Sequence, residues 1–249
     1  MAHFYLVDDL TDASVGSTVV VEGQEARHAV TVSRVRVGES LALGDGRGTS
    51  VRGEVVEATD SRLALVAAEV TRVERPGTRL VLVQALAKGD RDELAVQAAT
   101  ELGVDEVVPW SAARSVSRWE GAKVAKGTAR WRSITREATK QAIRPWAPVV
   151  SELSTTKQVA ARAADATTLV LVLEPSAERA LSDVVVEGGG GAPSSVLVVV
   201  GPEGGISPSE LELLGAAGAV PVRLGDAVLR TSTAGPAALA VLSVRLGRW

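Results

Sequence analysis

A run of five aliphatic residues followed by a glycine-rich turn constrains this chain more than any other stretch. Val196–Val200 contains four β-branched residues, which predicts a strand buried on both faces, as in a parallel sheet. Gly201-Pro202-Glu203-Gly204-Gly205 follows at once, and Ser207 then stands three residues before Glu210 in a capping-box pattern, with Pro208 at the first helical position. The sequence therefore predicts a strand, a loop and a helix from about Ser207 to Ala217.

The loop of this unit is a candidate ligand site. Free backbone N–H groups at the start of a helix can cradle an anion or a small ligand, and Gly204 and Gly205 can adopt a positive φ that lets a ligand approach the main chain. A tight turn that binds nothing would show the same pattern. No Lys-Ser/Thr pair follows the glycines and no G-x-G-x-x-G opens the helix, so neither common phosphate-binding device is present.

The rest of the chain divides at Arg75-Pro76-Gly77, which we interpret as a linker. Residues 1–73 contain short apolar runs separated by turn signals and one helical candidate, Gln24–Val35, which predicts a small β-barrel domain. Residues 74–249 alternate strands with helices, which predicts an α/β domain with a largely parallel sheet. Near its end we expect a strand at Pro221–Leu224 and a helix at Thr233–Leu246.

Composition excludes several classes of function. The chain has no cysteine and only two histidines, so disulfides and thiolate catalysis are excluded and a zinc site is disfavoured. No acidic cluster has the spacing of metal ligands, and we expect no metal. No apolar run approaches the ~20 residues that span a bilayer, and no secretory signal is present. We therefore expect a soluble, cytoplasmic protein.

Charge is concentrated in one segment although the net charge is only −3. Between Trp110 and Trp146 there are nine Lys and Arg residues and two Glu. Like charges four residues apart on a helix cost about 0.2–0.5 kcal/mol per pair, so an anionic partner such as RNA would compensate them; a solvated helix face is the alternative. The cations that we assign to RNA contact, two of them in the first domain, are Arg27, Arg34, Arg114, Arg132, Arg136, Lys140 and Arg144.

A second ligand-binding loop is predicted near the end of the chain, at Arg223–Ala234. A strand ends there and an alanine-rich helix begins, and open α/β sheets bind ligands at this carboxyl edge. The apolar and hydroxyl side chains of the loop suit an adenosine-like molecule better than a triphosphate.

These stretches together resemble the RsmE family, SPOUT-class methyltransferases that modify N3 of a uridine in 16S ribosomal RNA. The motifs that carry the resemblance include Lys88-Gly89-Asp90, Ala99–Val104 and Arg130-Trp131, and the most specific are Gly201–Gly205 and, after it, Leu229-Arg230-Thr231. The resemblance implies an N-terminal PUA-like β-barrel (1–73) and a C-terminal α/β trefoil-knot domain (74–249). It also implies S-adenosylmethionine as cofactor, a homodimer, and the small ribosomal subunit or its 16S rRNA as partner.

The resemblance also implies where the cofactor binds and which residues act in catalysis. The cofactor-binding residues carried over by motif are Leu173, Glu174, Gly201, Pro202, Glu203, Gly204, Gly205, Leu224, Gly225, Leu229, Arg230, Thr231 and Thr233. We expect Arg230 to stabilise the uridine anion, and Glu203 to act as a base or a positioning group. The chain departs from the family at Ser232 and Ala227, where the family commonly has Glu and Arg.

Two other functions fit the same residues. The chain could be a SPOUT enzyme acting on a tRNA or on a ribose oxygen, which the modified nucleoside would reveal. It could instead be a non-catalytic RNA-binding protein of ribosome assembly that kept the fold, in which case it would not bind the cofactor.

Overall fold

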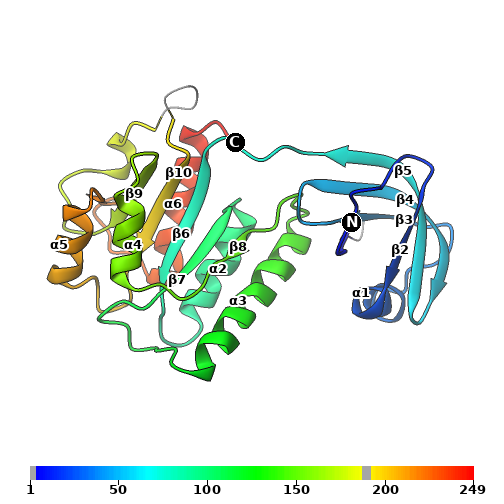
Figure 1. The fold of residues 1–249 in the computed structure, drawn as a ribbon, viewed down its shortest axis with the longest axis horizontal. Coiled ribbons are helices and arrows are strands. Elements are labelled where there is room, and N and C mark those ends of the chain that lie inside the picture. The colour runs from blue at the N-terminus through cyan, green and yellow to red at the C-terminus, as the bar shows by residue number, and fades with distance from the viewer. Residues whose placement is uncertain (1–3, 187–191) are drawn as a thin grey trace. The chain divides into compact units, whose positions relative to one another are not determined.

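The computed structural model describes residues 4–186 and 192–249, and the chain forms two compact units (Figure 1). The first takes in the chain up to Arg75 together with Thr139–Ala147, and the second comprises Pro76–Ala138 and Pro148–Trp249. Thr139–Ala147, which the boundaries drawn from the sequence leave in the second domain, groups with the first unit through specific bonds. Trp146 Nε1 donates to the carbonyl of Val73 at 2.9 Å, and Lys140 pairs with Glu25 at 3.5 Å.

The first unit is built on one curled five-stranded sheet with the strand order β1-β3-β4-β5-β2. β1 and β3 are parallel, and the other neighbours are antiparallel. Alternating side chains along β3 and β4, such as Leu41, Leu43, Val51 and Val55, are fully buried and form the core of this unit. The predicted β-rich first domain is thus confirmed. The strands are β1 (Phe4–Leu6), β2 (Thr18–Glu22), β3 (Ser40–Gly44), β4 (Thr49–Thr59) and β5 (Arg62–Arg72).

The helix predicted over Gln24–Val35 is shorter and irregular. A single α-helical segment, α1 (Gly23–Arg27), continues into a π-helical turn, η1 (His28–Val32). Arg34 has a φ of +56°, which an α-helix does not allow, so the helix ends before it. The buried positions Ala26 and Ala29 still face the core, so the apolar spacing located the segment but not its conformation.

The second unit contains a six-stranded, fully parallel sheet with the order β11-β9-β10-β6-β7-β8. β10 lies between β9 and β6, and its residues Val196–Val200 are buried. The prediction of a doubly buried strand is therefore confirmed. The strands are β6 (Arg79–Ala85), β7 (Glu106–Trp110), β8 (Val149–Val150), β9 (Thr168–Leu173), β10 (Ser195–Val200) and β11 (Val220–Val222), the last beginning and ending earlier than Pro221–Leu224.

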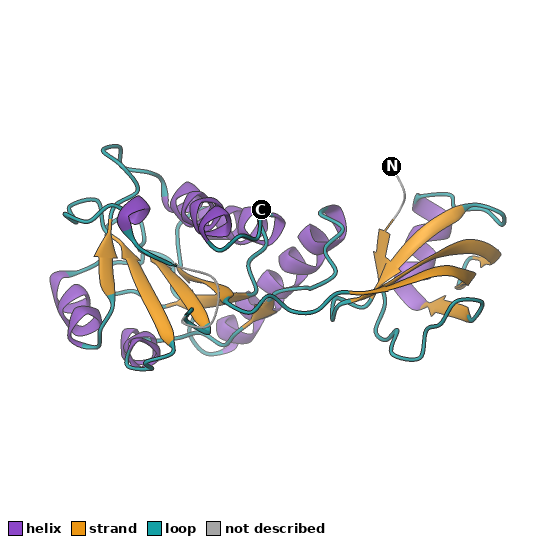
Figure 2. Ribbon diagram, turned by 90° about the horizontal axis from the view of Figure 1, so that it is seen from above, coloured by secondary structure: helices purple, strands orange, loops and turns teal. Residues whose placement is uncertain are grey.

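Helices cover both faces of this sheet, as Figure 2 shows. Residues of α2, α3 and α6 pack on one face, and residues of α4 and α5 pack on the other. α5 has the predicted capping box between Ser207 and Glu210 with Pro208 in its first turn. α6 begins two residues before the predicted start, because Arg230 is its N-cap. The helices are α2 (Arg91–Glu101), α3 (Ala122–Gln141), α4 (Thr156–Ala163), α5 (Pro208–Ala216) and α6 (Thr231–Arg245), with a short 3₁₀ turn η2 (Leu181–Asp183).

The amino edge of the sheet, where the strands begin, is closed by two groups of ion pairs. Arg248 donates to Asp105 Oδ2 at 2.5 Å and to the carbonyls of Gly103 and Thr78, while Asp105 also accepts from the backbone N–H of Leu80. The side chains of Arg248 and Asp105 are only 13% and 8% exposed. These bonds fix the end of the chain to the starts of β6 and β7.

Glu106 forms the second group at the amino edge. Its carboxylate accepts hydrogen bonds from Arg162 at 2.8 and 3.0 Å, from Arg79 at 3.3 Å and from Ser151 at 2.7 Å. Burial alone would raise the pKa of Glu106, but the bonds from Arg162 and Ser151 outweigh it and hold this pKa below its ordinary value. The carboxylate therefore stays ionised although it is buried.

Candidate functional site

Three neighbouring strands of the parallel sheet end at the same level. Val200 of β10 is in register with Leu173 of β9, and Leu173 is in register with Val222 of β11. The segments that follow the three strands therefore leave the sheet together, at its carboxyl edge. This is the place where open parallel sheets bind ligands.

The first loop at this edge is Gly201–Ile206, and two of its glycines are required by the local geometry. A Cβ on Gly201 would lie 2.7 Å from the side chain of Ile206, so only glycine permits this turn. Gly205 has a φ of +71°, and its N–H donates to the carbonyl of Pro202 at 2.9 Å. The glycine-rich sequence is thus explained by a tight turn that brings Ile206 back over the strand end.

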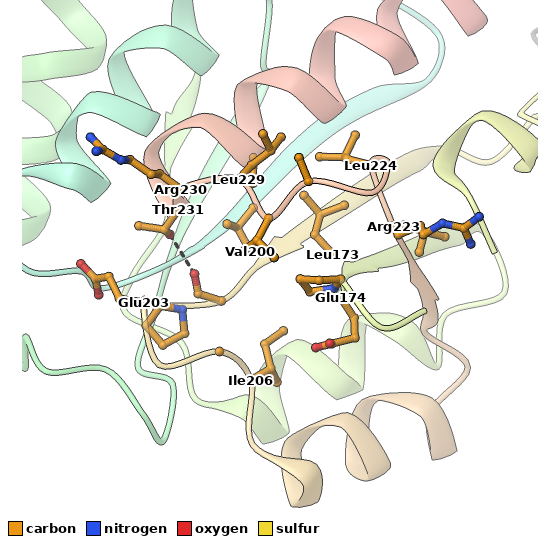
Figure 3. A pocket seen from close by; sticks show the side chains of 18 of the residues that line it. Leu173, Glu174, Val200, Glu203, Ile206, Arg223, Leu224, Leu229, Arg230 and Thr231 are labelled. Atoms are coloured by element: carbon orange, nitrogen blue, oxygen red, sulfur yellow. Dashed lines mark hydrogen bonds between the residues drawn. The ribbon is translucent and has the colours of Figure 1, made fainter. Parts of the chain in front are cut away.

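The second loop, residues 223–230, is attached to the first through Thr231. The Thr231 hydroxyl donates to the carbonyl of Gly201 at 2.8 Å, the bond drawn in Figure 3, and accepts from Gln84 Nε2 at 2.9 Å. Gln84 is fully buried at the end of β6 and also donates to the carbonyl of Ala85. A chain of two hydrogen bonds therefore connects β6, the start of α6 and the first loop.

A cavity of about 390 Å³ lies between these loops. It is lined by all but two of the thirteen predicted cofactor-binding residues, the exceptions being Gly204 and Thr233. The structure thus brings together residues separated by more than fifty positions in the sequence. The predicted residues in the lining are Leu173, Glu174, Gly201, Pro202, Glu203, Gly205, Leu224, Gly225, Leu229, Arg230 and Thr231.

The lining of the cavity matches an adenosine-like molecule with a charged tail. Apolar side chains of Leu173, Val200 and Leu224 surround the space, and Glu174 adds a carboxylate (Figure 3). Apolar walls with a few placed polar groups are typical of nucleoside pockets, and carboxylates accept hydrogen bonds from hydroxyl and ammonium groups. The residues present therefore fit S-adenosylmethionine.

Glu203 is held at one end of the cavity by two donors. Its Oε1 accepts from Arg91 Nη1 at 2.8 Å and from the backbone N–H of Lys88 at 3.1 Å. Partial burial raises the pKa of Glu203. Hydrogen bonds from its own N–H, from Arg91 and from Lys88 lower this pKa by more than burial raises it, so the net pKa lies below its ordinary value. This geometry favours the positioning role that we considered for Glu203 over the role of a base.

Arg91 is a lining residue that the sequence analysis missed. It is the first residue of α2 and directly follows the Lys88-Gly89-Asp90 motif. The signal for it was the adjacency of an arginine to that motif at the end of a buried strand. Arg230, by contrast, was predicted; its side chain is exposed at the same end of the cavity as Glu203 (Figure 3).

The cations predicted to contact RNA do not share one environment. Arg114 donates to the carbonyl of Gly204 at 3.1 Å and so supports the first loop. In α3, Arg132 pairs with Glu152 at 3.2 Å, and Lys140 is largely buried against Glu25. Arg136 and Arg144 also have partners within the protein. Carboxylates of the protein therefore compensate part of the charge of the α3 cations Arg132 and Lys140, for which the sequence alone indicates RNA as the compensating anion.

Arg27 and Arg34 differ from the α3 cations. Both are exposed on the first unit, and neither forms an ion pair with any residue in 4–186 or 192–249.

Three tryptophans of the basic segment have structural roles: Trp110 and Trp131 are buried, and Trp119 packs edge-on against Trp131, with 5.3 Å between the ring centroids.

Within the described part of the chain, no three His, Asp or Glu side chains cluster in a way that could hold a metal ion. None of the helices that the structure describes is both long and apolar enough to cross a bilayer.

Comparison with known families gives two matches. A family described as an RNA methyltransferase domain matches residues 74–243, and one described as an RNA methyltransferase PUA domain matches residues 21–67. The first match covers most of the parallel-sheet unit but also includes Thr139–Ala147, which groups with the other unit, and the second match lies within the curled-sheet unit.

Individual relatives resemble the chain over nearly its whole length. A ribosomal RNA small subunit methyltransferase E from Mycobacterium tuberculosis is 43% identical, with 100% of this chain and 94% of the relative covered. The Bacillus subtilis protein of the same name is 32% identical, over 91% and 90% of the two chains. Among solved structures, the Neisseria gonorrhoeae protein of this name, bound to S-adenosylmethionine, superposes with a TM-score of 0.86 at 26% identity, over 98% of each chain.

Proposed function

The chain belongs to the ribosomal RNA small subunit methyltransferase E family, and from this premise we propose that it methylates N3 of one uridine in 16S rRNA. It is an S-adenosylmethionine-dependent ribosomal RNA methyltransferase. The position on the base and the roles of individual residues are our proposal. The observation that carries it is the cavity at the carboxyl edge, closed by two loops bonded through Thr231, with Arg230 at its rim.

S-adenosylmethionine supplies an electrophilic methyl group on a sulfonium sulfur when it is bound. Leu173, Leu224 and Leu229 would provide apolar surface for its adenosine part, and the backbone of Gly201–Gly205 would provide close polar contacts. Holding both reactants in one cavity can lower the activation barrier by roughly 7–11 kcal/mol. The remaining task of the residues is to stabilise the uracil after it has lost its N3 proton.

The ionisable side chains around the cavity support an anion-stabilising mechanism. They are Arg91, Glu174, Glu203, Arg223 and Arg230. Glu203, with its lowered pKa, is a poor proton acceptor. Arg230 is a fixed cation that stabilises the uridine anion once solvent has taken the N3 proton, in the manner of an oxyanion site. N3 of uridine suits this device because its negative charge spreads onto the two neighbouring carbonyl oxygens.

Nucleoside analysis of small-subunit rRNA tests the proposed product. RNA from cells lacking the protein should lack one 3-methyluridine, and expression of the wild-type chain should restore it. Expression of Arg230→Ala at the same level should not. A missing ribose-methylated nucleoside, or a missing tRNA modification, would instead identify the other SPOUT activity.

RNA contact is proposed for the exposed cations of the first unit. Arg27 and Arg34 are supported by their exposure and by the match to a PUA domain. Each phosphate neutralised should contribute roughly −0.7 to −0.9 to the slope of log affinity against log salt. The double variant Arg27→Ala/Arg34→Ala should flatten that slope, and replacement of Arg136, Lys140 and Arg144 should flatten it only if they also touch the backbone.

A homodimer working in the cytoplasm completes the proposal. The dimer is implied by the family resemblance, and the neighbouring apolar side chains of Val228 and Leu229, 78% and 38% exposed at the rim of the cavity, are ones that a second subunit would bury. Sedimentation should show a dimer for the wild type and a monomer for Val228→Asp. A wild-type monomer at micromolar concentration would contradict this part. The location follows from the substrate, because ribosomal RNA lies in the cytoplasm of the bacteria that contain the relatives.

A further inference from the structure

Arg91 occupies a position that the proposed mechanism has not used. It lines the cavity from the first turn of α2, and its side chain is 45% exposed. The turn before it is fixed: Asp90 has a φ of +56°, and Asp92 Oδ2 accepts from the backbone N–H of Ala87 at 3.1 Å. The backbone that carries Arg91 is therefore held in place independently of its side chain.

The Arg91 guanidinium keeps most of its donors available. A guanidinium has five N–H groups, and one bond within the described residues involves this side chain, from Nη1 to Glu203 Oε1 at 2.8 Å. Glu203 is itself fixed by the backbone N–H of Lys88. The carboxylate thus orients the guanidinium at the cavity without saturating it.

Arg91 and Arg230 are presented by two helices that start at the same edge of the sheet. α2 begins after β6 and packs against α6, whose N-cap is Arg230. At the other end, Arg248, just after α6, donates to the carbonyl of Gly103, just after α2. The two helices therefore run in the same direction, and both begin at the cavity.

We propose that Arg91 is a second anion-stabilising residue, which donates to one carbonyl oxygen of the target uracil while Arg230 donates to the other. This inference rests on the proposed methylation at N3, because loss of the N3 proton spreads negative charge onto O2 and O4, which flank that nitrogen. The proton goes to solvent water. The N3 electron pair then forms the bond to the methyl carbon, the carbon–sulfur bond breaks, and its electron pair stays on sulfur.

Two guanidinium groups also explain how the reaction proceeds without a general base. Each cation beside a carbonyl oxygen favours the ionised base and lowers the pKa of N3 in the complex. The methylation rate should therefore rise with pH, and this rising limb of the pH–rate profile should report the pKa of N3. Loss of one guanidinium should move the limb to higher pH. A residue that only ordered the loop would not move it.

The experiment measures kcat, KM and the pH dependence of methyl transfer to small ribosomal subunits for Arg91→Ala, Arg91→Lys and Glu203→Gln. Calorimetry with S-adenosylmethionine is run on each variant. Lys157→Ala, which removes an exposed cation on α4 away from the cavity, is the matched control. For Arg91→Ala we expect kcat to fall by about 10- to 100-fold, which is no more than the loss typical of removing one oxyanion donor. The rising part of the pH–rate profile should move to higher pH.

The variants separate contact with uracil from ordering of the loop. Arg91→Lys keeps the charge and should recover part of kcat, and cofactor affinity should stay within about threefold in both Arg91 variants. Equal losses of cofactor affinity in Arg91→Ala and Glu203→Gln, with an unmoved pH limb, would overturn the inference. A wild-type product other than 3-methyluridine would instead overturn the proposed function. An unchanged kcat in Arg91→Ala, with 3-methyluridine still formed, would overturn the role of Arg91 alone.

Discussion

At the amino edge of the parallel sheet, buried ion pairs close the core, whereas at the carboxyl edge the same strands lead into loops that leave a cavity. Arg248 and Glu106 each bond to several partners at the amino edge. At the carboxyl edge, Arg230 is exposed and the loops are joined through a single threonine hydroxyl. From this comparison we expect stability and chemistry to be concentrated at opposite ends of the same strands, so variants at the two edges should affect different measurements.

The largest effect is expected from breaking the amino edge at Arg248. Arg248→Ala leaves the buried carboxylate of Asp105 without its cation, and removal of one partner of a buried pair costs about 3–5 kcal/mol of unfolding free energy. Denaturant unfolding measures the loss, and calorimetry should show nearly unchanged cofactor affinity in the folded protein. Arg245→Ala is the control: among residues 4–186 and 192–249, the Arg245 side chain bonds only to the carbonyl of Ser182, so its loss should cost less than about 1 kcal/mol. A similar small cost for both would show that the amino edge is not what stabilises the unit.

The carboxyl edge should respond in the opposite way to Arg230→Ala. We expect kcat to fall by about 10²–10³-fold, because the proposed donor to the developing anion is removed from the site. The unfolding free energy should change by less than about 0.5 kcal/mol, since the side chain is exposed. Single-turnover methylation and denaturant unfolding of the same preparation give both numbers. A variant that methylates at the wild-type rate while binding cofactor normally would remove Arg230 from the mechanism.

Acid should distinguish the two edges through Glu106 and Asp92. The pKa of Glu106 is lowered in the folded protein. Its contribution to the unfolding free energy is therefore fully present at pH values above its unfolded pKa of about 4.5, and it is lost as the pH falls through the folded pKa. Burial raises the pKa of Asp92, at the start of α2, and backbone hydrogen bonds offset only part of this rise. The ionised form of Asp92 therefore lowers the stability of the protein, and protonation in acid restores it. Glu106→Gln should therefore destabilise the protein at pH 7 by about 1.5–3 kcal/mol and by less in acid.

Asp92→Asn is the matched variant for that pH measurement. Its side-chain oxygen can still accept from Ala87, although the bond from the Glu93 N–H to the other oxygen is lost, so at pH 7 the substitution should cost less than Glu106→Gln. Unfolding curves of both variants between pH 3 and pH 7 test the pair. Parallel pH dependences would contradict the opposite electrostatics that we assign to the two edges.

The smallest effect is expected from Gln84, which joins β6 to the cavity loops. Gln84→Leu removes the donor to Thr231 Oγ1, and one net hydrogen bond is worth about 0.5–1.5 kcal/mol. Cofactor affinity should fall a few-fold, because the two loops lose part of their connection. A double-mutant cycle with Thr231→Val measures the coupling between the two side chains. A coupling energy indistinguishable from zero would show that Gln84 acts only as a core residue.

Much of this arrangement could be predicted from local sequence. The valine run identified β10, the Ser207–Glu210 spacing identified the cap of α5, and the alternation of strands and helices predicted the parallel sheet. The two loops could be assigned to one edge because parallel strands all end there. The knotted path of the chain and the dimer remain predictions that rest on the family resemblance.

What could not be predicted depends on contacts between distant segments. The pairing of Arg91 with Glu203 joins residues that are 112 positions apart, and the pairing of Lys140 with Glu25 joins residues 115 apart. The ladder of cations in α3 indicated an external anion only because the protein carboxylates that face it were unknown. The early start of α6 was missed because Arg230 has no capping side chain that a pattern would detect.

The level ends of β9, β10 and β11 also determine which changes in length evolution can accept. Deleting one residue from β9 would draw Leu173 back by roughly 3.3 Å and turn every later side chain of that strand to the opposite face. The floor of the cavity would then be uneven and its apolar wall reversed. In alignments of distant relatives, gaps should therefore fall in the connections that return to the amino edge, and never within these three strands.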